Sequence, residues 1–270
     1  MGFFDNLWRI LRYEAEIPRM LGIFHITCLS VVFALTLLFC LKFKDASDKT
    51  VRRILLFAWL ILLFTELYKQ LAYSFSFDGD GGVSDYLWLS FPFQFCSMPL
   101  YVLPLAAFLK DGRFRDGIIS FISTYLLFAG IAVMIYPGNV YVYMVGINIQ
   151  TMIHHGAQVL VGFLLLIHTR NKKGIVPFLV GAMIFLLLAV AALAMNIHVY
   201  TVMAERGVEK SFNMFFLNPY SDCPLPILSA IKAGAPYPVF FLTYVLGFTA
   251  IAASLVAVRE LILRLIKGQK

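Results

Sequence analysis

Residues 175–197 read IVPFLVGAMIFLLLAVAALAMNI, an apolar run without a single charged side chain. A run of about 20 such residues is long enough for one helix to cross the hydrocarbon core of a bilayer. The rest of the chain has the same character, because 61% of its 270 residues are hydrophobic and only 14% are charged. Soluble domains contain about 25% charged residues. The composition therefore predicts a polytopic membrane protein.

Seven apolar segments of this kind predict an all-α fold, a bundle of seven transmembrane helices. The third segment is interrupted by Pro92, Pro99 and Pro104. Proline removes a main-chain donor and kinks a helix, which a membrane protein tolerates where neighbours or water satisfy the freed carbonyl. We therefore expect the third segment in the interior of the bundle. The segments are residues 20–41, 54–75, 87–109, 117–136, 149–167, 175–197 and 239–258.

Lysine and arginine residues gather in alternate loops. They occur after the first, third, fifth and seventh segments, whereas the loops after the second and fourth contain none. Because basic loops stay in the cytoplasm, this pattern predicts an N-terminus outside the cell and a cytoplasmic C-terminus. The net charge of +7 then belongs to the cytoplasmic rim, beside anionic headgroups, and needs no nucleic-acid partner. We expect an integral plasma membrane protein, of a bacterial cell.

Two terminal segments flank the membrane domain, which we place at residues 20–258. Residues 1–19 set Phe3, Phe4 and Trp8 among charged positions, which predicts an amphipathic helix on the outer interface. Residues 259–270 form a basic tail in the cytoplasm.

The longest loop, residues 198–238, has an unusual second half. Aromatic residues alternate there with polar ones, among them Asn218 and Tyr220. Loops of this length are usually functional or disordered, and so apolar a composition does not suit disorder. The loop is therefore predicted to fold back over the mouth of the bundle as a cap.

Polar side chains within the segments lie at one depth. With a rise of 1.5 Å per residue, their positions fall about 8–14 Å beneath the outer face. An ionisable residue at such a depth is costly, so a layer of them predicts a functional site near the outer leaflet. The layer contains His25, Glu66, Lys69, Gln94, Cys96, His154 and His155.

Several of these residues also have a purely structural interpretation. Glu66 and Lys69 are three apart on a helix and can simply pair with each other. A single histidine such as His25 is often a hydrogen-bonded packing residue. Neighbouring side chains on a helix point about 100° apart, so one ring of His154 and His155 can face the site while the other braces a neighbour. The sequence leaves open which one does so.

One chemistry that fits the layer is covalent acyl transfer. Cys96 would attack a lipid ester, while a histidine takes the thiol proton and returns it to the leaving lyso-lipid. Gln94 or main-chain donors would stabilise the oxyanion, and the thioester would pass its acyl chain to another alcohol or to water. This route requires no metal and no cofactor. Cys223, in an outer loop, could alternatively form a disulfide with Cys96.

Two other functions could use the same residues. A zinc hydrolase of the seven-helix ceramidase type would hold its metal through His25, one histidine of the pair, His198 and a carboxylate. However, two zinc ligands on one helix normally stand three or four residues apart, and no such pair of histidines occurs here. A non-enzymatic lipid or small-molecule transporter would also use Glu66, Lys69 and a kinked third segment.

The order of the polar clusters resembles a known family. Over residues 20–258 it is similar to the bacterial YwaF-like integral membrane proteins, which are related to the animal transmembrane protein 164. The motifs that carry the resemblance are Ile23-Phe24-His25, Thr65-Glu66-Leu67-Tyr68-Lys69, Pro92-Phe93-Gln94-Phe95-Cys96, Ile153-His154-His155-Gly156, Asn218-Pro219-Tyr220 and Pro236-Tyr237-Pro238.

This resemblance implies an activity and a substrate. The animal protein is held to be an acyltransferase whose cysteine and histidine move an acyl chain between phospholipids without acyl-CoA. Those roles would fall on Cys96 and on His154 or His155, with membrane phospholipids as substrates. His25 and Glu66 would then orient the base or hold water, and the cap would cover the cavity.

Overall fold

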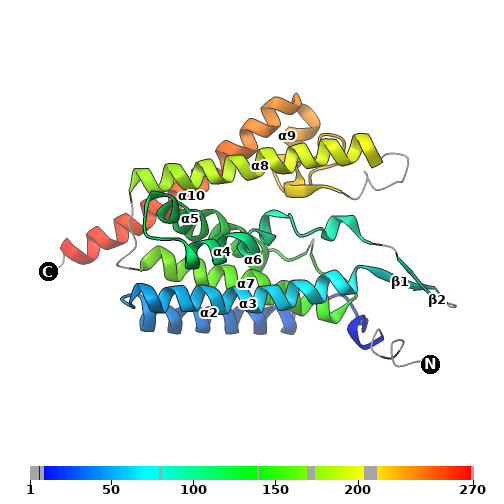
Figure 1. Ribbon diagram of the computed structural model, residues 1–270, viewed down its shortest axis with the longest axis horizontal. Helices are drawn as coiled ribbons and strands as arrows, with labels where there is room; N and C mark the ends of the chain where they lie inside the picture. Colours follow the sequence, from blue (N-terminus) through cyan, green and yellow to red (C-terminus); the bar gives the residue numbers. More distant parts are fainter. Residues whose placement is uncertain are drawn as a thin grey trace.

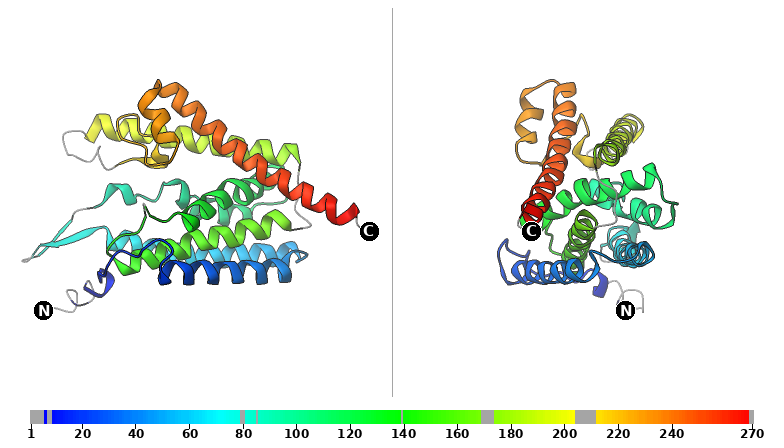
Figure 2. Two further views of the ribbon diagram at one scale, coloured as in Figure 1. Left: turned by 180° about the vertical axis from the view of Figure 1, so that it is seen from behind. Right: turned by 90° about the vertical axis from the view of Figure 1, so that its left-hand side faces the viewer.

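The computed structural model describes residues 6, 9–78, 81–84, 86–138, 140–168, 174–203 and 212–268. These parts of the chain are mainly helical. The helices are α2 (Ile23–Phe43), α3 (Asp48–Ala72), α4 (Pro99–Phe108), α5 (Arg113–Phe121), α6 (Leu127–Ile135), α7 (Val145–Ile167), α8 (Ile175–Met203), α9 (Leu228–Gly234) and α10 (Tyr237–Gly268). Figure 1 shows α2 and α3 on one side of the molecule and α8 to α10 on the other, with α4 to α7 between them. The end-on view in Figure 2 shows the same three layers.

Six helical segments of the described chain are long and apolar enough to cross a bilayer. Five of them are single helices, namely α2, α3, α7, α8 and α10. The sixth joins α5 to α6 through a π-helical turn, Ile122–Leu126, into one continuous rod. These six match six of the seven segments expected from the sequence.

The remaining segment, residues 87–109, corrects the expectation of seven regular helices. It forms two short 3₁₀ turns, Trp88–Ser90 and Phe95–Ser97, before the ten-residue helix α4 begins. Proline explains the break: Pro92 and Pro99 lack the N–H that a continuous helix would use, and Pro99 instead occupies the start of α4, where that donor is dispensable. The expected interior position holds for one face only: α4 packs against α3 and buries five of its ten residues. Tyr101, Leu105 and Phe108 on its other face are exposed.

Two arginines fix the far end of α4. Arg52 and Arg115 donate to three carbonyls in and just after its last turn, at 2.6–2.8 Å. Arg115 also pairs with Asp48 at 2.8 Å, which brings the first turns of α3 and α5 together. Residues 73–112 must therefore return along the whole length of α3, and α4 is the last part of that return.

A two-stranded hairpin departs from the expected all-α fold. Strands β1 (Phe75–Asp78) and β2 (Gly81–Ser84) pair in antiparallel fashion, with Phe75 opposite Ser84. The hairpin follows α3 directly and projects from that end of the bundle (Figure 1).

The N-terminal segment also differs from its prediction. Its described helical residues end at Leu11, and the chain then becomes extended instead of continuing as a helix to residue 19. There the Ala15 N–H donates to the carbonyl of Tyr143 at 2.9 Å, and Glu14 forms a β-bridge with Met144. The expected apolar residues Phe3, Phe4 and Trp8 lie outside the described residues.

Near the C-terminus of the chain, helices extend into the predicted cap and into the predicted basic tail. Helix α8 continues to Met203, so the predicted cap, residues 198–238, begins as helix and later includes α9. Within this cap, residues 204–211 lie outside the described residues. Helix α10 runs on to Gly268, so most of the predicted tail, residues 259–270, is helical.

Aromatic rings fill the junction between the layers. Phe95, beside Cys96, lies 5.4 Å from Phe185 of α8, measured between ring centroids. Tyr125 of the π turn stacks on Phe185 at 4.7 Å, and Phe248 of α10 lies 5.5 Å from Phe95. Aromatic pairs at such distances stabilise a fold beyond the burial of their surface. The turn that carries Cys96 is therefore packed between the middle layer and the layer of α8 and α10.

Candidate functional site

The candidate site is centred on Cys96, in the 3₁₀ turn before α4. Its main-chain carbonyl accepts hydrogen bonds from His154 Nε2 at 2.9 Å and from Gln158 Nε2 at 2.6 Å. His154 and Gln158 are four residues apart, so both lie on one face of α7. Pro99 has no N–H with which to close a turn on this carbonyl, which leaves the carbonyl to the side chains of α7.

The structure distinguishes the two adjacent histidines. His154 contacts Cys96, whereas His155 donates through Nδ1 to the carbonyl of Thr151 at 2.8 Å. Asn148, on the His155 side of the helix, bonds to the main chain before α7 and takes no part in the contact with Cys96. The centroids of the two imidazole rings lie 5.9 Å apart, so the His155 ring is an immediate neighbour of the His154 ring, which contacts Cys96.

Both histidines are neutral in this arrangement. A carbonyl only accepts hydrogen bonds, so His154 carries its proton on Nε2 and His155 carries its proton on Nδ1. The other nitrogens, His154 Nδ1 and His155 Nε2, are buried and have no hydrogen-bond partner. A second proton there would create a buried and unpaired charge, which is costly. Each ring therefore presents one lone pair that can accept a proton.

The ion pair on α3 lies beside these groups. Lys69 Nζ is 2.9 Å from Glu66 Oε1, and both side chains are largely buried. Gln70 donates to the same Glu66 oxygen at 2.6 Å, while Glu66 Oε2 has no partner. Electrostatic interactions connect Lys69 with Cys96, His154 and His155. The pairing within α3 that the sequence allowed is thus formed, and it sets a cation next to the thiol.

Two predicted residues of the layer bind main chain elsewhere. His25 accepts from the Leu21 N–H at 2.9 Å and donates to the carbonyl of Met134 at 2.7 Å, so both of its ring nitrogens are used. Gln94 donates to the carbonyl of Asn213 at 3.0 Å and accepts from the Phe215 N–H at 3.1 Å. His25 therefore joins α2 to α6, and Gln94 anchors the cap.

The cap over the site begins at residue 212 of the described chain. Asn196 of α8 clamps it by bonding both main-chain groups of Met214, at 2.8 and 2.9 Å. Phe215 and Phe216 each have a φ of 56°, a left-handed conformation that costs a residue with a side chain about 1–2 kcal/mol. This backbone turns the Phe215 ring onto Phe95, with centroids 5.3 Å apart, next to Cys96.

Asn218 and Tyr220 belong to the cap, as expected, but neither contacts Cys96. The Asn218 amide bonds the Phe212 carbonyl at 2.8 Å and the Tyr220 N–H at 2.9 Å. The ring of Tyr220 stacks on Tyr200 at 3.8 Å and is 54% exposed. Lys232 of α9 donates to the Asn218 carbonyl, and burial lowers the pKa of this lysine. These contacts make the cap a folded unit.

The structure does not form the other constellations considered from the sequence. The four cysteines are free thiols, so Cys96 and Cys223 form no disulfide. His198 is exposed, and His25 is bonded to main chain. Across the described residues, no three His, Cys, Asp or Glu side chains come together as a metal-binding set.

Sequence reasoning missed one partner of the layer. Gln70 connects Glu66 to the turn before Cys96, through a 2.9 Å bond to the Ser90 carbonyl, and is itself held by the Tyr86 hydroxyl at 2.7 Å. Its position one helical turn after Glu66 was the available signal.

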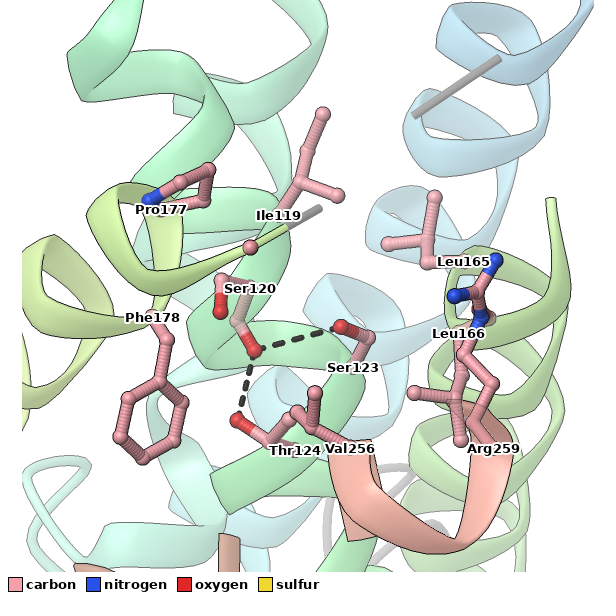
Figure 3. Close-up of a pocket in the computed structure, with 11 residues that line it drawn as sticks. Ile119, Ser120, Ser123, Thr124, Leu165, Leu166, Pro177, Phe178, Val256 and Arg259 are labelled. Atoms are coloured by element: carbon pink, nitrogen blue, oxygen red, sulfur yellow. Dashed lines mark hydrogen bonds between the residues drawn. The ribbon is translucent and has the colours of Figure 1, made fainter. Parts of the chain in front are cut away.

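A separate small cavity lies at the other end of α7, among α5, α8 and α10 (Figure 3). The carbonyl of Ser120 accepts there from the hydroxyls of Ser123 and Thr124, at 3.2 and 2.7 Å. These bonds pair the Ser120 carbonyl just before the π turn, where the regular helical hydrogen-bond pattern changes. Arg259 closes the cavity by donating to the Leu166 carbonyl at 2.7 Å.

The TMEM164 family model matches residues 20–256. The chain belongs to the TMEM164 family. No curated protein and no solved structure matches it. The TMEM164 match includes Cys96, both histidines of α7, the ion pair on α3 and the described cap. Together with the six long apolar helices, it makes this TMEM164 family member an integral membrane protein.

Proposed function

We propose that the protein is a membrane phospholipid acyltransferase that works through a thioester on Cys96, with His154 as the base. The observation that carries the proposal is the hydrogen bond from His154 to the Cys96 carbonyl. It holds a neutral imidazole against the residue that bears the thiol. A thiol needs such a base, because the thiolate is the nucleophile.

The reaction has two balanced steps. First, the thiol of Cys96 attacks the ester carbon of a phospholipid, a C–S bond forms, and the C–O bond to the lyso-lipid breaks. The thiol proton passes to His154 and then to the leaving alcohol oxygen. Second, an acceptor hydroxyl attacks the thioester, gives its proton to His154, and the C–S bond breaks to restore the thiol. Water in place of the acceptor would give hydrolysis.

The surrounding residues fit this chemistry. Lys69 is a cation that interacts electrostatically with Cys96, and it would favour the thiolate and the oxyanion that follows, whereas burial and the Glu66 carboxylate oppose the thiolate. Glu66 pairs with Lys69, and Gln70 donates to the same Glu66 oxygen. The cap shields the thioester from bulk water and has to move for a lipid to enter.

We also propose seven crossings of the plasma membrane, with the N-terminus outside and the site towards the outer leaflet. Residues 73–112 return along α3, which supports a crossing that is only partly helical. A phospholipid acyl donor is consistent with this orientation, since a site under the outer face does not meet cytoplasmic acyl-CoA.

Intact-protein mass spectrometry after incubation with vesicles of one defined phospholipid tests the proposal. Wild-type protein and the Cys223→Ala control should gain the mass of one acyl chain, and Cys96→Ala should not. Loss of the adduct on hydroxylamine treatment would identify a thioester. An adduct that persists in Cys96→Ala, or lipid remodelling at the full rate by that variant, would disprove the mechanism.

A further inference from the structure

Four buried polar atoms around Cys96 have no hydrogen-bond partner among the residues that the structure describes. They are Glu66 Oε2, His154 Nδ1, His155 Nε2 and Gln158 Oε1. Their residues are only 3–5% exposed, so bulk water does not reach them. Buried polar groups in proteins are nearly always paired, and a set of unpaired ones calls for a group that completes them.

All four atoms are hydrogen-bond acceptors. The two histidine nitrogens carry lone pairs, because the protons of both rings are donated to carbonyls. The Gln158 amide cannot be reversed, since the atom 2.6 Å from the Cys96 carbonyl has to be the N–H donor. The free oxygen of Glu66 belongs to a carboxylate whose other oxygen already receives Lys69 and Gln70. The group that completes this layer must therefore supply several N–H or O–H donors.

We infer that the ligand group bound in this layer is a neutral pair of adjacent hydroxyls, such as the free diol end of a monoacylated glycerol. Phosphate oxygens, ester oxygens and quaternary ammonium groups have no proton to donate. A primary ammonium has donors, but it would bring a second cation beside Lys69 at low dielectric. A diol supplies two donors without charge, enough for two of the four acceptors.

The inference rests on the proposed function in one respect, because one of these hydroxyls would be the acyl acceptor. In the second step that hydroxyl attacks the thioester carbon, its proton passes to a histidine lone pair, the C–S bond breaks, and the histidine returns the proton to the leaving sulfur. The second hydroxyl stays bonded to another acceptor and orients the first.

A binding measurement tests the inference without relying on catalysis. Purified protein in detergent would be titrated with a 1-monoacylglycerol and with its 2,3-di-O-methyl ether, which keeps the same chain and ester but has no donor. We expect the diol to bind about tenfold or more tightly, to wild type and to Cys96→Ala alike. A primary-amine analogue of the diol should bind more weakly than the diol. Equal affinity for diol and ether, or a preference for the amine, would overturn the inference.

Variants then identify which protein acceptors bind the hydroxyl donors of the diol. His155→Phe removes one unpaired acceptor and should lower the preference for the diol over the ether about threefold or more. Glu66→Gln tests the same loss on α3, if His155→Phe does not fold. The matched control is His25→Phe, a buried histidine whose ring nitrogens are both paired elsewhere, and its preference should equal that of wild type. The same loss of preference in the control would contradict the assignment.

The two proposals fail separately. An acyl adduct on Cys96 without a preference for the diol would remove the inference and leave the acyltransferase. A preference for the diol without any adduct would leave the binding site and remove the thioester.

Discussion

The main-chain carbonyl of Cys96, and not its thiol, is the atom that organises the site at the scale of single residues. Two side chains of α7 reach it because Pro99 cannot. The motif with prolines on both sides of Cys96 thus creates a carbonyl inside the bundle that has no main-chain donor. Side chains of α7 supply its donors instead. The two nitrogens of His154 thus have different roles. Nε2 positions the ring against the Cys96 carbonyl, and Nδ1 is able to take a proton.

That separation gives a prediction for His154. His154→Gln places an amide near the position of Nε2, so it keeps a donor for the Cys96 carbonyl but removes the basic lone pair. We expect the melting temperature to stay close to that of wild type, while the rate of acyl adduct formation falls about 100-fold or more. Thermal unfolding and time-resolved intact mass measure the two quantities. A full rate in this variant would move the role of base to His155.

Residue chemistry was easier to predict from the sequence than residue partners were. The sequence identified Cys96, both histidines and the pair Glu66 and Lys69, because ionisable residues stand out in an apolar chain. It offered Gln94 or main-chain donors for the oxyanion, and in the structure the Gln94 amide bonds the cap. Partners of this kind depend on how segments far apart in the chain meet, which no local pattern specifies.

At the scale of elements, the side chain of Asn196 hydrogen-bonds the cap to α8. Asn196 is fully buried and bonds both main-chain groups of Met214. In Asn196→Ala, the two cap groups lose their partners, and we expect the cap to open more often and Cys96 to react with a maleimide about tenfold faster. Peptide mass spectrometry of Cys96 labelling gives the rate. Thr201→Ala, on the exposed end of α8, is the control, and equal rates in both variants would show that Asn196 does not hold the cap.

Helix α4 provides a second prediction at this scale. The Arg115 side chain is only 6% exposed and bonds a carbonyl of α4, Asp48 and Asp111. Arg115→Met leaves that carbonyl with one donor fewer, while both carboxylates remain partly exposed to solvent. We expect the free energy of unfolding in detergent to fall by about 2 kcal/mol. The exposed neighbour Arg113→Met should change it by less than about 0.5 kcal/mol. A similar loss in both variants would mean that α4 is held by its apolar contacts alone.

The long helices were predictable because their apolar runs are nearly continuous, and α5 joined to α6 shows that even a π turn does not disturb such a run. The segment before α4 was not, because Pro92 and Pro99 indicate where a helix cannot continue but not what replaces it. Pro104 carries the same sequence signal, yet it lies inside α4. The hairpin after α3 was missed for a different reason: a short run rich in glycine and serine carries little strand signal.

At the scale of the whole molecule, the contact between Asp48 and Arg115 bears on the number of membrane crossings. Because α3 and α5 begin side by side, the chain between them has to leave and return through the full height of the bundle. If that return counts as a crossing, the chain crosses seven times and its ends lie on opposite sides. A return that stayed on one side would give six crossings and put the ends together, but it would require α3 and α5 to begin on opposite sides, against the Asp48–Arg115 pair.

Tags at the two ends distinguish these cases. We expect an N-terminal tag to bind antibody on intact cells and a C-terminal tag to do so only after permeabilisation, as the basic loops require. A single cysteine at Asp45, exposed between α2 and α3, should follow the C-terminal tag, and one at Tyr220 should follow the N-terminal tag, both in a protein whose four native cysteines are replaced. Tags on the same side would reduce the crossings to six and contradict the side-by-side start of α3 and α5. Reversed labelling of every position would keep seven crossings but put Cys96 under the cytoplasmic face, where acyl-CoA becomes a possible donor.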